Sequence, residues 1–251
     1  MSLLLAVDTS GALVTVAAAD GDSLLAEQAV ELAARHAEHL APMIAAVLVE
    51  AGRAIDEVSA VAVGVGPGPF TGLRVGVVTA RVLGLVLGVP VIGVCSLDAL
   101  ALQVAEWGEG SAGSAAGAGD LAAGREFVVT SDARRREVYW AAYRTGDGEP
   151  EPVRGPGVDR PADLASAAAR DGLGQKGFGP FFGRGAALYP EVLTAPPEGA
   201  PLDVRAGAVA RLAGRRVARV GGSERARGQE PVPLYLRRPD AVAPGARKRV
   251  S

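Results

Sequence analysis

The first hundred residues alternate between short apolar runs and turn residues, a pattern that predicts strands and helices in regular succession. The runs "LLLAVDTS" and "ALVTVAAAD" are rich in β-forming residues, and the turn sequence "DTSG" joins them, so they predict a β-hairpin. A third strand, "LLAEQAVEL", follows after "DGD". Next, "HAEHLAPMIAAVLVEAG" has apolar residues at helical spacing and stops at Gly52, so it predicts an amphipathic helix with an apolar face formed by Leu40, Met43, Ile44, Val47 and Leu48.

The segments that follow predict two further strand and helix pairs. A strand is expected at 58–65 and a helix from about Thr71 to Leu87. The apolar run "PVIGVC" predicts another strand, and Ser96 is expected to cap a helix that ends near Trp107. The predicted order of this part of the chain is βββαβαβα, which indicates an α/β fold.

The second half of the chain repeats the opening pattern after a segment of low complexity. Residues 108–124 are rich in Gly, Ala and Ser, which is typical of a flexible loop between domains. The run "EFVVTSDARRREVYWAAYR" then predicts a second hairpin in which Asp132 corresponds to Asp8. Later elements are a helix at 161–170, a strand in "KGFGPFFGRG" and a helix from about Asp203 to Val220. The predicted division is a first lobe at 1–107, the loop, a second lobe at 125–238 and a basic tail at 239–251.

The charge of the chain is unevenly distributed along it. The net charge of the 251 residues is −2, and 49% of them are hydrophobic, which is enough to bury a sizeable core. Residues 1–100 carry 4 basic and 10 acidic side chains, whereas residues 205–251 carry 12 basic and 3 acidic ones. The basic end predicts either contact with an anionic partner such as RNA or a solvated tail.

The single cysteine and the apolar runs suggest a cytoplasmic protein. Cys95 lies in an apolar run and has no partner for an intramolecular disulfide, so a reducing compartment is expected. The N-terminal residues lack the basic region of a signal peptide. The apolar stretch "VLGLVLGVPVIGVC" is too short to span a bilayer and is interrupted by Gly88 and Pro90, so no contact with a membrane is expected.

The stretch "GVGPGPFTGLRVG", residues 64–76, carries the strongest chemical signal in the sequence. A glycine-rich loop that leaves a strand and opens a helix is typical of a phosphate cradle. A second hypothesis is architectural, with Pro67 and Pro69 stiffening the loop and Thr71 capping the helix. Under the first hypothesis the candidate nucleotide-binding residues lie in this loop and in the first hairpin: Asp8, Thr9, Ser10, Gly66, Gly68 and Thr71.

The helix after this loop carries a stripe of small residues at every fourth position, which lets another element approach closely. The remaining positions are mostly apolar, so the helix must be covered on more than one side. One hypothesis is that it joins the helix at 37–51 in binding a partner protein; the alternative is that the stripe packs against its own lobe. The candidate interface residues are His39, Leu40, Met43, Val47, Gly76, Ala80, Arg81 and Gly84.

Two lobes that each begin with a hairpin resemble the actin, Hsp70 and sugar-kinase superfamily, whose fold is ribonuclease H-like. Within it, "AVDTS", "HAEHLAPMIAAVLVEAG", "VGVGPGPFTGLRVG" and the late "PLYLRRP" resemble the TsaB (formerly YeaZ) family. The resemblance extends over residues 1–107 and is recognisable over 125–145 and 230–238. It implies a non-catalytic dimerisation subunit that supports the TsaD threonylcarbamoyltransferase in forming N6-threonylcarbamoyladenosine at position 37 of tRNAs that read codons beginning with A.

The resemblance also implies partners and cofactors. The partners are TsaD in a heterodimer, the ATPase TsaE, and tRNA through the complex, and the subunit alone is expected either as a monomer or as a homodimer. ATP and a divalent metal are used by the complex through its partners, and no cofactor is expected on this subunit. TsaD carries a metal-binding His-x-x-x-His, whereas this sequence has Ser96 and Leu100 at those positions, so no metal site is expected. His36 and His39 lack further ligands nearby in the sequence.

Two other functions remain open from the sequence. One is an enzyme, either an ATP-binding phosphotransferase or an M22-type peptidase-like protein. The turn "DARRR" in the second hairpin places Arg134, Arg135 and Arg136 where superfamily kinases have small residues, which argues against close approach of a phosphate to the backbone. The other is direct binding of tRNA phosphates by the arginine-rich stretch from Arg205 to Arg249.

Overall fold

The computed structural model describes residues 3–31, 36–110, 121, 123–146, 148–171, 180–219 and 231–237. The first lobe contains, in chain order, β1 (Leu3–Asp8), β2 (Leu13–Asp20), β3 (Ser23–Glu31), α1 (His36–Glu50), the short 3₁₀ helix η1 (Ile55–Glu57), β4 (Val58–Gly64), α2 (Phe70–Leu87), β5 (Val91–Val94) and α3 (Ser96–Gly110). The predicted order βββαβαβα is confirmed, and α3 continues to Gly110 instead of ending near Trp107. Most of the predicted loop at 108–124 lies outside the described residues, so the domain boundary there stays a prediction.

The first lobe is built on a five-stranded sheet with the order β3-β2-β1-β4-β5. Its first three strands are antiparallel, and β4 and β5 add to β1 in parallel. The central strand β1 is buried on both faces because its side chains alternate between two cores. Leu5 and Val7 pack with α1 and α2 on one face, whereas Leu4 and Ala6 belong to the core on the other face.

The second lobe has a smaller sheet with the order β8-β7-β6-β9. The predicted hairpin is confirmed, since β6 and β7 pair antiparallel from Glu126 opposite Arg144 to Asp132 opposite Val138. The predicted glycine-rich strand is reduced to the two residues of β9, and its first part at 176–179 lies outside the described residues. Pattern analysis missed β8, α5 and α6. The elements of this lobe are β6 (Glu126–Asp132), β7 (Val138–Arg144), β8 (Glu151–Asp159), α4 (Pro161–Asp171), β9 (Phe181–Phe182), α5 (Arg184–Leu188), α6 (Pro190–Leu193) and α7 (Ala206–Arg219).

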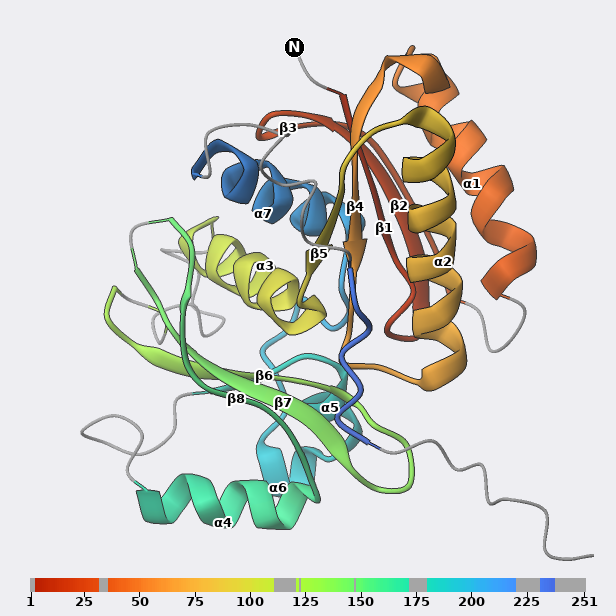
Figure 1. Ribbon diagram of the computed structural model, residues 1–251. Helices are drawn as coiled ribbons and strands as arrows, with labels where there is room; N and C mark the ends of the chain where they lie inside the picture. The colour runs from red at the N-terminus through yellow and green to blue at the C-terminus, as the bar shows by residue number, and fades with distance from the viewer. Residues whose placement is uncertain are drawn as a thin grey trace, which may run out of the picture.

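The two sheets and their helices form alternating layers (Figure 1). Helices α1 and α2 cover the outer face of the first sheet, and α3 and α7 lie between the two sheets. Helices α4, α5 and α6 cover the outer face of the second sheet. One core cluster contains residues of β1, α3, β6, β7 and α7, so the lobes share their largest core. This arrangement confirms the predicted two-lobed fold of the actin, Hsp70 and sugar-kinase type.

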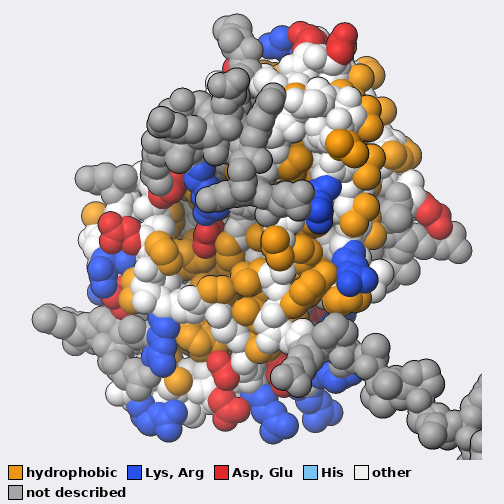
Figure 2. All heavy atoms as spheres, viewed as in Figure 1, with side chains coloured by type: hydrophobic (Ala, Val, Ile, Leu, Met, Phe, Trp, Pro, Cys, Tyr) orange, Lys and Arg blue, Asp and Glu red, His pale blue; other side chains and the backbone are white. Residues whose placement is uncertain are grey.

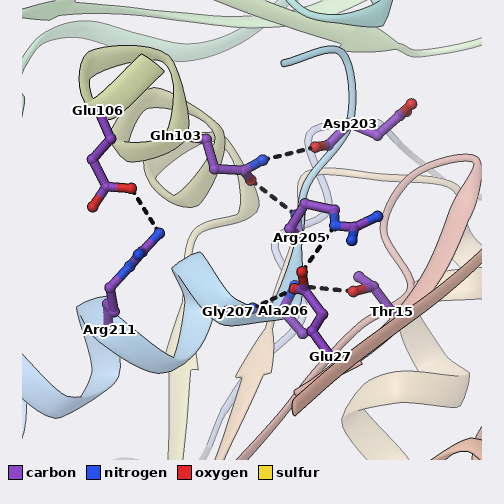
Figure 3. Close-up of polar contacts among 9 residues, drawn as sticks. All are labelled: Thr15, Glu27, Gln103, Glu106, Asp203, Arg205, Ala206, Gly207 and Arg211. Carbon is purple, nitrogen blue, oxygen red and sulfur yellow. Dashed lines mark hydrogen bonds and ion pairs between the residues drawn. The ribbon is translucent and has the colours of Figure 1, made fainter. Parts of the chain in front are cut away.

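Helix α7 returns from the second lobe and is fixed to the first by hydrogen bonds at its N-terminus (Figure 3). The backbone N–H of Ala206 donates to Oγ1 of Thr15 (3.0 Å), and that of Gly207 donates to Oε1 of Glu27 (2.8 Å). Both acceptors lie on the first sheet, so they satisfy N–H groups that the first turn of a helix leaves unpaired. The same Glu27 carboxylate also pairs with Arg205 at 3.0 Å.

Three arginines of α7 form ion pairs with acidic side chains of the first lobe. Arg211 pairs with Glu106 of α3 at 2.7 Å (Figure 3), and Arg216 pairs with Asp98 at 2.8 Å. Arg215 lies 3.4 Å from a carboxylate oxygen of Asp22. This part of the arginine-rich stretch therefore neutralises acidic side chains of the first lobe, and the hypothesis that the stretch from Arg205 to Arg249 binds tRNA stays a prediction. The tail at 239–251 lies outside the described residues.

Residues 231–237, called here the connecting segment, run across both lobes in an extended form. The N–H of Leu234 donates to the carbonyl of Val65 at 2.7 Å, next to the glycine-rich loop. At the other end, Arg237 donates to the carbonyl of Ala133 at 3.0 Å and forms an ion pair with Glu137, both in the turn of the second hairpin. The connecting segment thus joins the loop of the first lobe to the hairpin of the second.

Candidate functional site

The glycine-rich loop and the first turns of α2 pack directly on the turn of the first hairpin. Oγ1 of Thr9 donates to the carbonyl of Gly72 at 2.7 Å and accepts from the N–H of Gly76 at 3.1 Å. A Cβ atom at Gly72 would lie 2.6 Å from the carbonyl oxygen of Thr9, and one at Gly68 would overlap the backbone of Ser10. These glycines are needed because two backbones approach closely, which is a structural reason for the sequence pattern.

Asp8 lies at the centre of this contact and is fully buried. Its Oδ1 accepts from the N–H of Ser10 (2.8 Å) and from the Ser10 hydroxyl (2.7 Å), and its Oδ2 accepts from the Ser96 hydroxyl (2.7 Å). The Ser96 oxygen in turn accepts from the N–H of Gly66 at 3.1 Å. A side chain at Gly64 would overlap the Asp8 carboxylate. Asp8 therefore connects three segments of the first lobe: the first hairpin, the glycine-rich loop and the start of α3.

Burial raises the pKa of Asp8 above its ordinary value, and the hydrogen bonds from Ser96 and Ser10 oppose this shift without cancelling it. A buried carboxyl group with these partners is held in place by the protein itself. Within the described residues, no three His, Cys, Asp or Glu side chains gather closely enough to hold a metal ion. The chemistry available at Asp8 is therefore that of a structural hydrogen-bond acceptor.

Two predicted helix caps are wrong. Helix α2 begins at Phe70 with Pro69 in the capping position and without a side-chain cap, and Thr71 is an exposed residue of the first turn. Proline fixes the backbone at this position and can start a helix without a hydroxyl cap. Ser96 is the first residue of α3, and its hydroxyl bonds Asp8 and Gly66 instead of its own helix. A serine before an apolar run is ambiguous in sequence because its hydroxyl has the same chemistry in both roles.

The candidate nucleotide-binding residues fall into two groups. Asp8, Thr9 and Ser10 are buried, and each bonds or packs against the protein itself. The other three lie in the loop and at the start of α2: Gly68 contacts the backbone of Ser10, Gly66 has a φ of +94° and lies against Leu73, and Thr71 is exposed. The observed contacts thus support the architectural hypothesis for the loop, whereas the nucleotide-binding role of these residues stays a prediction.

The stripe of small residues on α2 faces the sheet of its own lobe. A Cβ atom at Gly76 would lie 2.5 Å from Oγ1 of Thr9, one at Gly84 would overlap Cγ2 of Val91, and Ala80 is fully buried. Gly88 ends the helix in the left-handed conformation with φ +67°. In the structure, the small residues of α2 therefore pack against their own lobe.

Most of the predicted interface residues are consequently interior residues. Leu40, Met43 and Val47 of α1 are buried in the core that also contains Val77 and Ala80 of α2. Of the eight predicted residues, His39 and Arg81 are exposed and the other six are buried within this chain. The physical reason is that small residues permit close approach by any element, and here that element is the sheet. Their part in an interface with a partner stays a prediction.

The exposed face of α2 is apolar, in keeping with the expectation that this helix needs cover on more than one side, although its large apolar residues were not among the predicted interface residues. Its exposed fractions are 56% for Val78, 53% for Val82, 83% for Leu85 and 73% for Val86. Figure 2 shows hydrophobic side chains gathered over α2 and the adjoining edge of the first lobe. Such a patch of large apolar side chains marks a contact surface. The available signal was the set of large apolar residues that lie between the small ones of the stripe.

Helix α2 is also long and apolar enough to cross a membrane by length and composition, the one such helix in the described part of the chain. Its inner face packs against β4 and β1 and belongs to the core of the first lobe. The helix is therefore a core element of the first lobe with one exposed face.

The predicted family is matched by known proteins of the same fold. The family model of TsaD, tRNA N6-adenosine threonylcarbamoyltransferase, matches residues 29–192. The solved structure of YeaZ from Pseudomonas aeruginosa has a TM-score of 0.68 and 30% sequence identity, and the match covers 94% of this chain and 100% of that one. The likeness thus extends over both lobes.

Curated relatives differ in how much of their length is matched. An uncharacterized protein of Mycobacterium leprae is 41% identical over 187 residues, which are 73% of this chain and 46% of that protein. An uncharacterized protein of Mycobacterium tuberculosis is 36% identical over 245 residues, or 96% and 94% of the two chains. The tRNA threonylcarbamoyladenosine biosynthesis protein TsaB of Escherichia coli is 32% identical over 142 residues, or 56% and 54%. The chain spans about half of the length of the M. leprae and E. coli relatives.

Proposed function

The chain belongs to the TsaD/YeaZ family, and from this premise we propose that it is a non-catalytic partner subunit of a TsaD-like threonylcarbamoyltransferase. In this function it binds and supports the catalytic subunit while N6-threonylcarbamoyladenosine is formed at position 37 of tRNAs that read codons beginning with A. A TsaE-like ATPase and the tRNA join the same complex, and ATP and a divalent metal act at the partners.

The observation that carries the proposal is the exposed apolar face of α2, defined by Val78, Val82, Leu85 and Val86. Burial of one such side chain is worth roughly 1.5–3 kcal/mol, so their joint exposure to water is costly without a partner. The face lies on a helix that is fixed to the sheet through Gly76 and Gly84, so it is presented rigidly. A rigid surface loses little conformational entropy when it binds.

The character of the partner follows from the same face. An apolar helical ridge is best covered by another apolar helix, and four helices from two related lobes make a compact bundle. Catalytic groups then come from the partner, because the buried Asp8 of this chain serves its fold.

The test is complex formation with the TsaD-like protein of the same organism, measured by size-exclusion chromatography with light scattering. The variant Val82→Glu/Leu85→Glu places two charges on the apolar face while keeping good helix formers there. The matched control is Leu188→Glu, which changes a half-exposed leucine on α5 in the second lobe. Circular dichroism establishes that each variant is folded.

We expect the wild type and the control to form a stable heterodimer and the double variant to bind at least about 100-fold more weakly, since two buried apolar contacts are lost. Modification of tRNA by the reconstituted complex should fall in parallel. A folded double variant that binds like the wild type would contradict the proposal, as would a wild type that does not bind. Light scattering of the chain alone shows whether the same face also forms a homodimer.

A further inference from the structure

The two lobes share a core, and polar contacts also join them at three separate places. The first place centres on Asp98 of α3. Its Oδ1 accepts from the hydroxyl of Tyr143 of β7 (2.8 Å), and its Oδ2 accepts from Nη2 of Arg216 of α7 (2.8 Å). Tyr143 is 2% exposed, and Nη1 of Arg216 also donates to the carbonyl of Gly93 of β5 at 3.2 Å. One carboxylate of the first lobe is thus shared by a strand of the second lobe and by the returning helix α7.

The second place is a cluster around Arg184, the first residue of α5 in the second lobe. Its guanidinium forms a bidentate contact with Asp203, in which Nε lies 2.8 Å from Oδ1 and Nη2 lies 2.6 Å from Oδ2. Nη1 lies 3.1 Å from a carboxylate oxygen of Glu31, at the end of β3 in the first lobe. The backbone N–H of Arg184 donates to the carbonyl of Leu202 at 2.8 Å. Arg184 therefore links its own lobe to β3 and to the segment that leads into α7.

The segment that leads from α6 into α7, residues 194–205, is itself fixed to the first lobe (Figure 3). The carbonyl of Asp203 accepts from Nε2 of Gln103 of α3 at 3.2 Å, and Oε1 of Gln103 accepts from the N–H of Arg205 at 2.9 Å. A Cβ atom at Gly11 would lie 3.8 Å from Oδ1 of Asp203, so this carboxylate lies beside the first hairpin. The Asp203 side chain is 11% exposed, so removal of its cation would leave a largely buried charge without compensation.

The third place is the connecting segment, which is attached to both lobes. The hydrogen bond of Leu234 and the ring of Tyr235, whose centroid lies 5.0 Å from that of Phe70, attach it to the first lobe. The ion pair between Arg237 and Glu137 attaches it to the second. In Figure 1 this segment, in blue, runs down between the lobes toward the β6–β7 turn.

We propose that Arg184 acts as a clasp that, together with the connecting segment, holds the two lobes in one fixed arrangement, so that the chain does not open and close between them. Movement of one lobe relative to the other requires that few contacts cross the boundary. Here the two described segments that pass between the lobes, at 194–205 and at 231–237, are each fixed to both sides. Opening would break these contacts together with the shared core.

The chemistry of Arg184 suits this role. A guanidinium that forms two parallel hydrogen bonds with a carboxylate fixes direction as well as distance. Its third nitrogen reaches Glu31, so one planar group meets carboxylates on two segments outside its own lobe. Displacement of α5 from β3 would separate one cation from two anions.

A fixed arrangement has a consequence for any surface of the molecule. The exposed face of α2 and the outer helices of the second lobe keep one spatial relation, so no lobe movement has to be arrested when a partner binds. The proposal concerns the chain alone and goes beyond the proposed function. It is tested without a partner protein, so its failure would leave the binding of a TsaD-like protein untouched.

The experiment measures the distance between the lobes in the full chain by double electron–electron resonance. Nitroxide labels are attached at Glu50→Cys on α1 and Ser166→Cys on α4, which are exposed and lie on the outer helices of the two lobes, in a chain that carries Cys95→Ser. The test variants are Arg184→Ala and Arg184→Lys, the second of which keeps the charge but not the bidentate geometry.

The matched control is Arg144→Ala. It removes an ion pair of 2.7 Å with Glu126, and both of these residues lie on the hairpin of the second lobe. A general loss of stability would affect this control as well, whereas loss of the clasp would not. Glu31→Gln removes only the contact with β3 from a side chain that is 63% exposed, so this variant should fold normally. Circular dichroism establishes that each labelled chain is folded.

We expect one narrow distance distribution for the labelled chain with Arg184 intact, and the same distribution for Arg144→Ala. Arg184→Ala should broaden it about twofold or more, because the lobes then sample further arrangements, with smaller effects for Arg184→Lys and Glu31→Gln. A broad or two-peaked distribution for the intact chain would overturn the proposal, as would a folded Arg184→Ala chain with an unchanged distribution. If Arg184→Ala does not fold, Glu31→Gln decides, and an unchanged width for it rejects the clasp.

Discussion

Asp8 is the residue whose role changes most between sequence and structure. In the sequence it opens the turn "DTSG" and is a candidate nucleotide-binding residue. In the structure its carboxyl group receives three hydrogen bonds and joins the first hairpin to Ser96 of α3. A buried acceptor whose hydrogen-bond partners come from two segments of the protein stabilises the fold by joining those segments.

The raised pKa of Asp8 predicts how stability depends on pH. Because the folded pKa lies above the ordinary value of about 3.9, the contribution of Asp8 to stability is fully present below that pH and is lost as pH rises through the folded pKa. Asp8→Asn cannot ionise and keeps an acceptor for Ser10. We therefore expect the stability of the variant, relative to the wild type, to rise between pH 4 and pH 8.

The measurement for Asp8→Asn is urea unfolding at several pH values, followed by circular dichroism. Asp56→Asn, at an exposed aspartate of η1, is the control and should follow the wild type at every pH. A difference between Asp8→Asn and the wild type that stays constant with pH, or that falls as pH rises, would refute the assignment.

At the scale of elements, α2 has two faces with different functions. Its small residues pack on the sheet, whereas its large apolar residues point outward. Gly84 and Leu85 are neighbours in sequence but lie on opposite faces. The same helix thus fixes the lobe internally and presents the surface for a partner.

This division predicts different changes in stability for two alanine variants, Gly84→Ala and Leu85→Ala. At Gly84 a new Cβ atom would overlap Val91, and overpacking of this kind costs about 1–3 kcal/mol, more than the gain of about 1 kcal/mol in helix propensity. Leu85→Ala removes an exposed side chain and should change stability by no more than about 0.5 kcal/mol. Urea unfolding gives the free energy of unfolding of both variants. Equal losses of stability would show that the two faces of α2 are assigned incorrectly.

At the scale of the whole molecule, the lobes are joined by contacts between distant parts of the chain. Helix α7 is fixed to β2 and β3 through Thr15 and Glu27, and the connecting segment joins Val65 to the second hairpin. These contacts are made by the last described segments of the chain, which return to the first lobe. A cavity of about 240 Å³ lies beside the start of α2, and residues of both lobes and of the connecting segment line it.

Truncation tests the contribution of the connecting segment. A chain that ends at Glu230 loses the hydrogen bond from Leu234, the Phe70–Tyr235 ring contact and the ion pair of Arg237, and should be less stable by roughly 2–3 kcal/mol. A chain that ends at Arg237 retains these contacts and should match the full chain. Thermal unfolding compares the three, and equal midpoints would indicate that the segment contributes little.

The sequence by itself determined the strands and α-helices of the first lobe, the second hairpin and the apolar face of α1. These features depend on local periodicity and turn chemistry, which can be read along one segment at a time. Helical spacing identified Leu40, Met43 and Val47 as one face, and that face is buried. The sequence also indicated the family, because its motifs keep their order along the chain.

Only the tertiary structure decided which surface of each element is free. A helix that is apolar on all sides does not indicate which side the sheet will cover, so the exposed ridge of Val82 and Leu85 could not be separated from the buried stripe of Gly76 and Gly84. Likewise, the arginines of α7 find acidic partners that lie 100 or more residues away, and the cavity gathers residues from position 68 to position 237. The physical reason is that burial, ion pairing and cavity shape are properties of neighbours in space, and those neighbours are set by long-range packing.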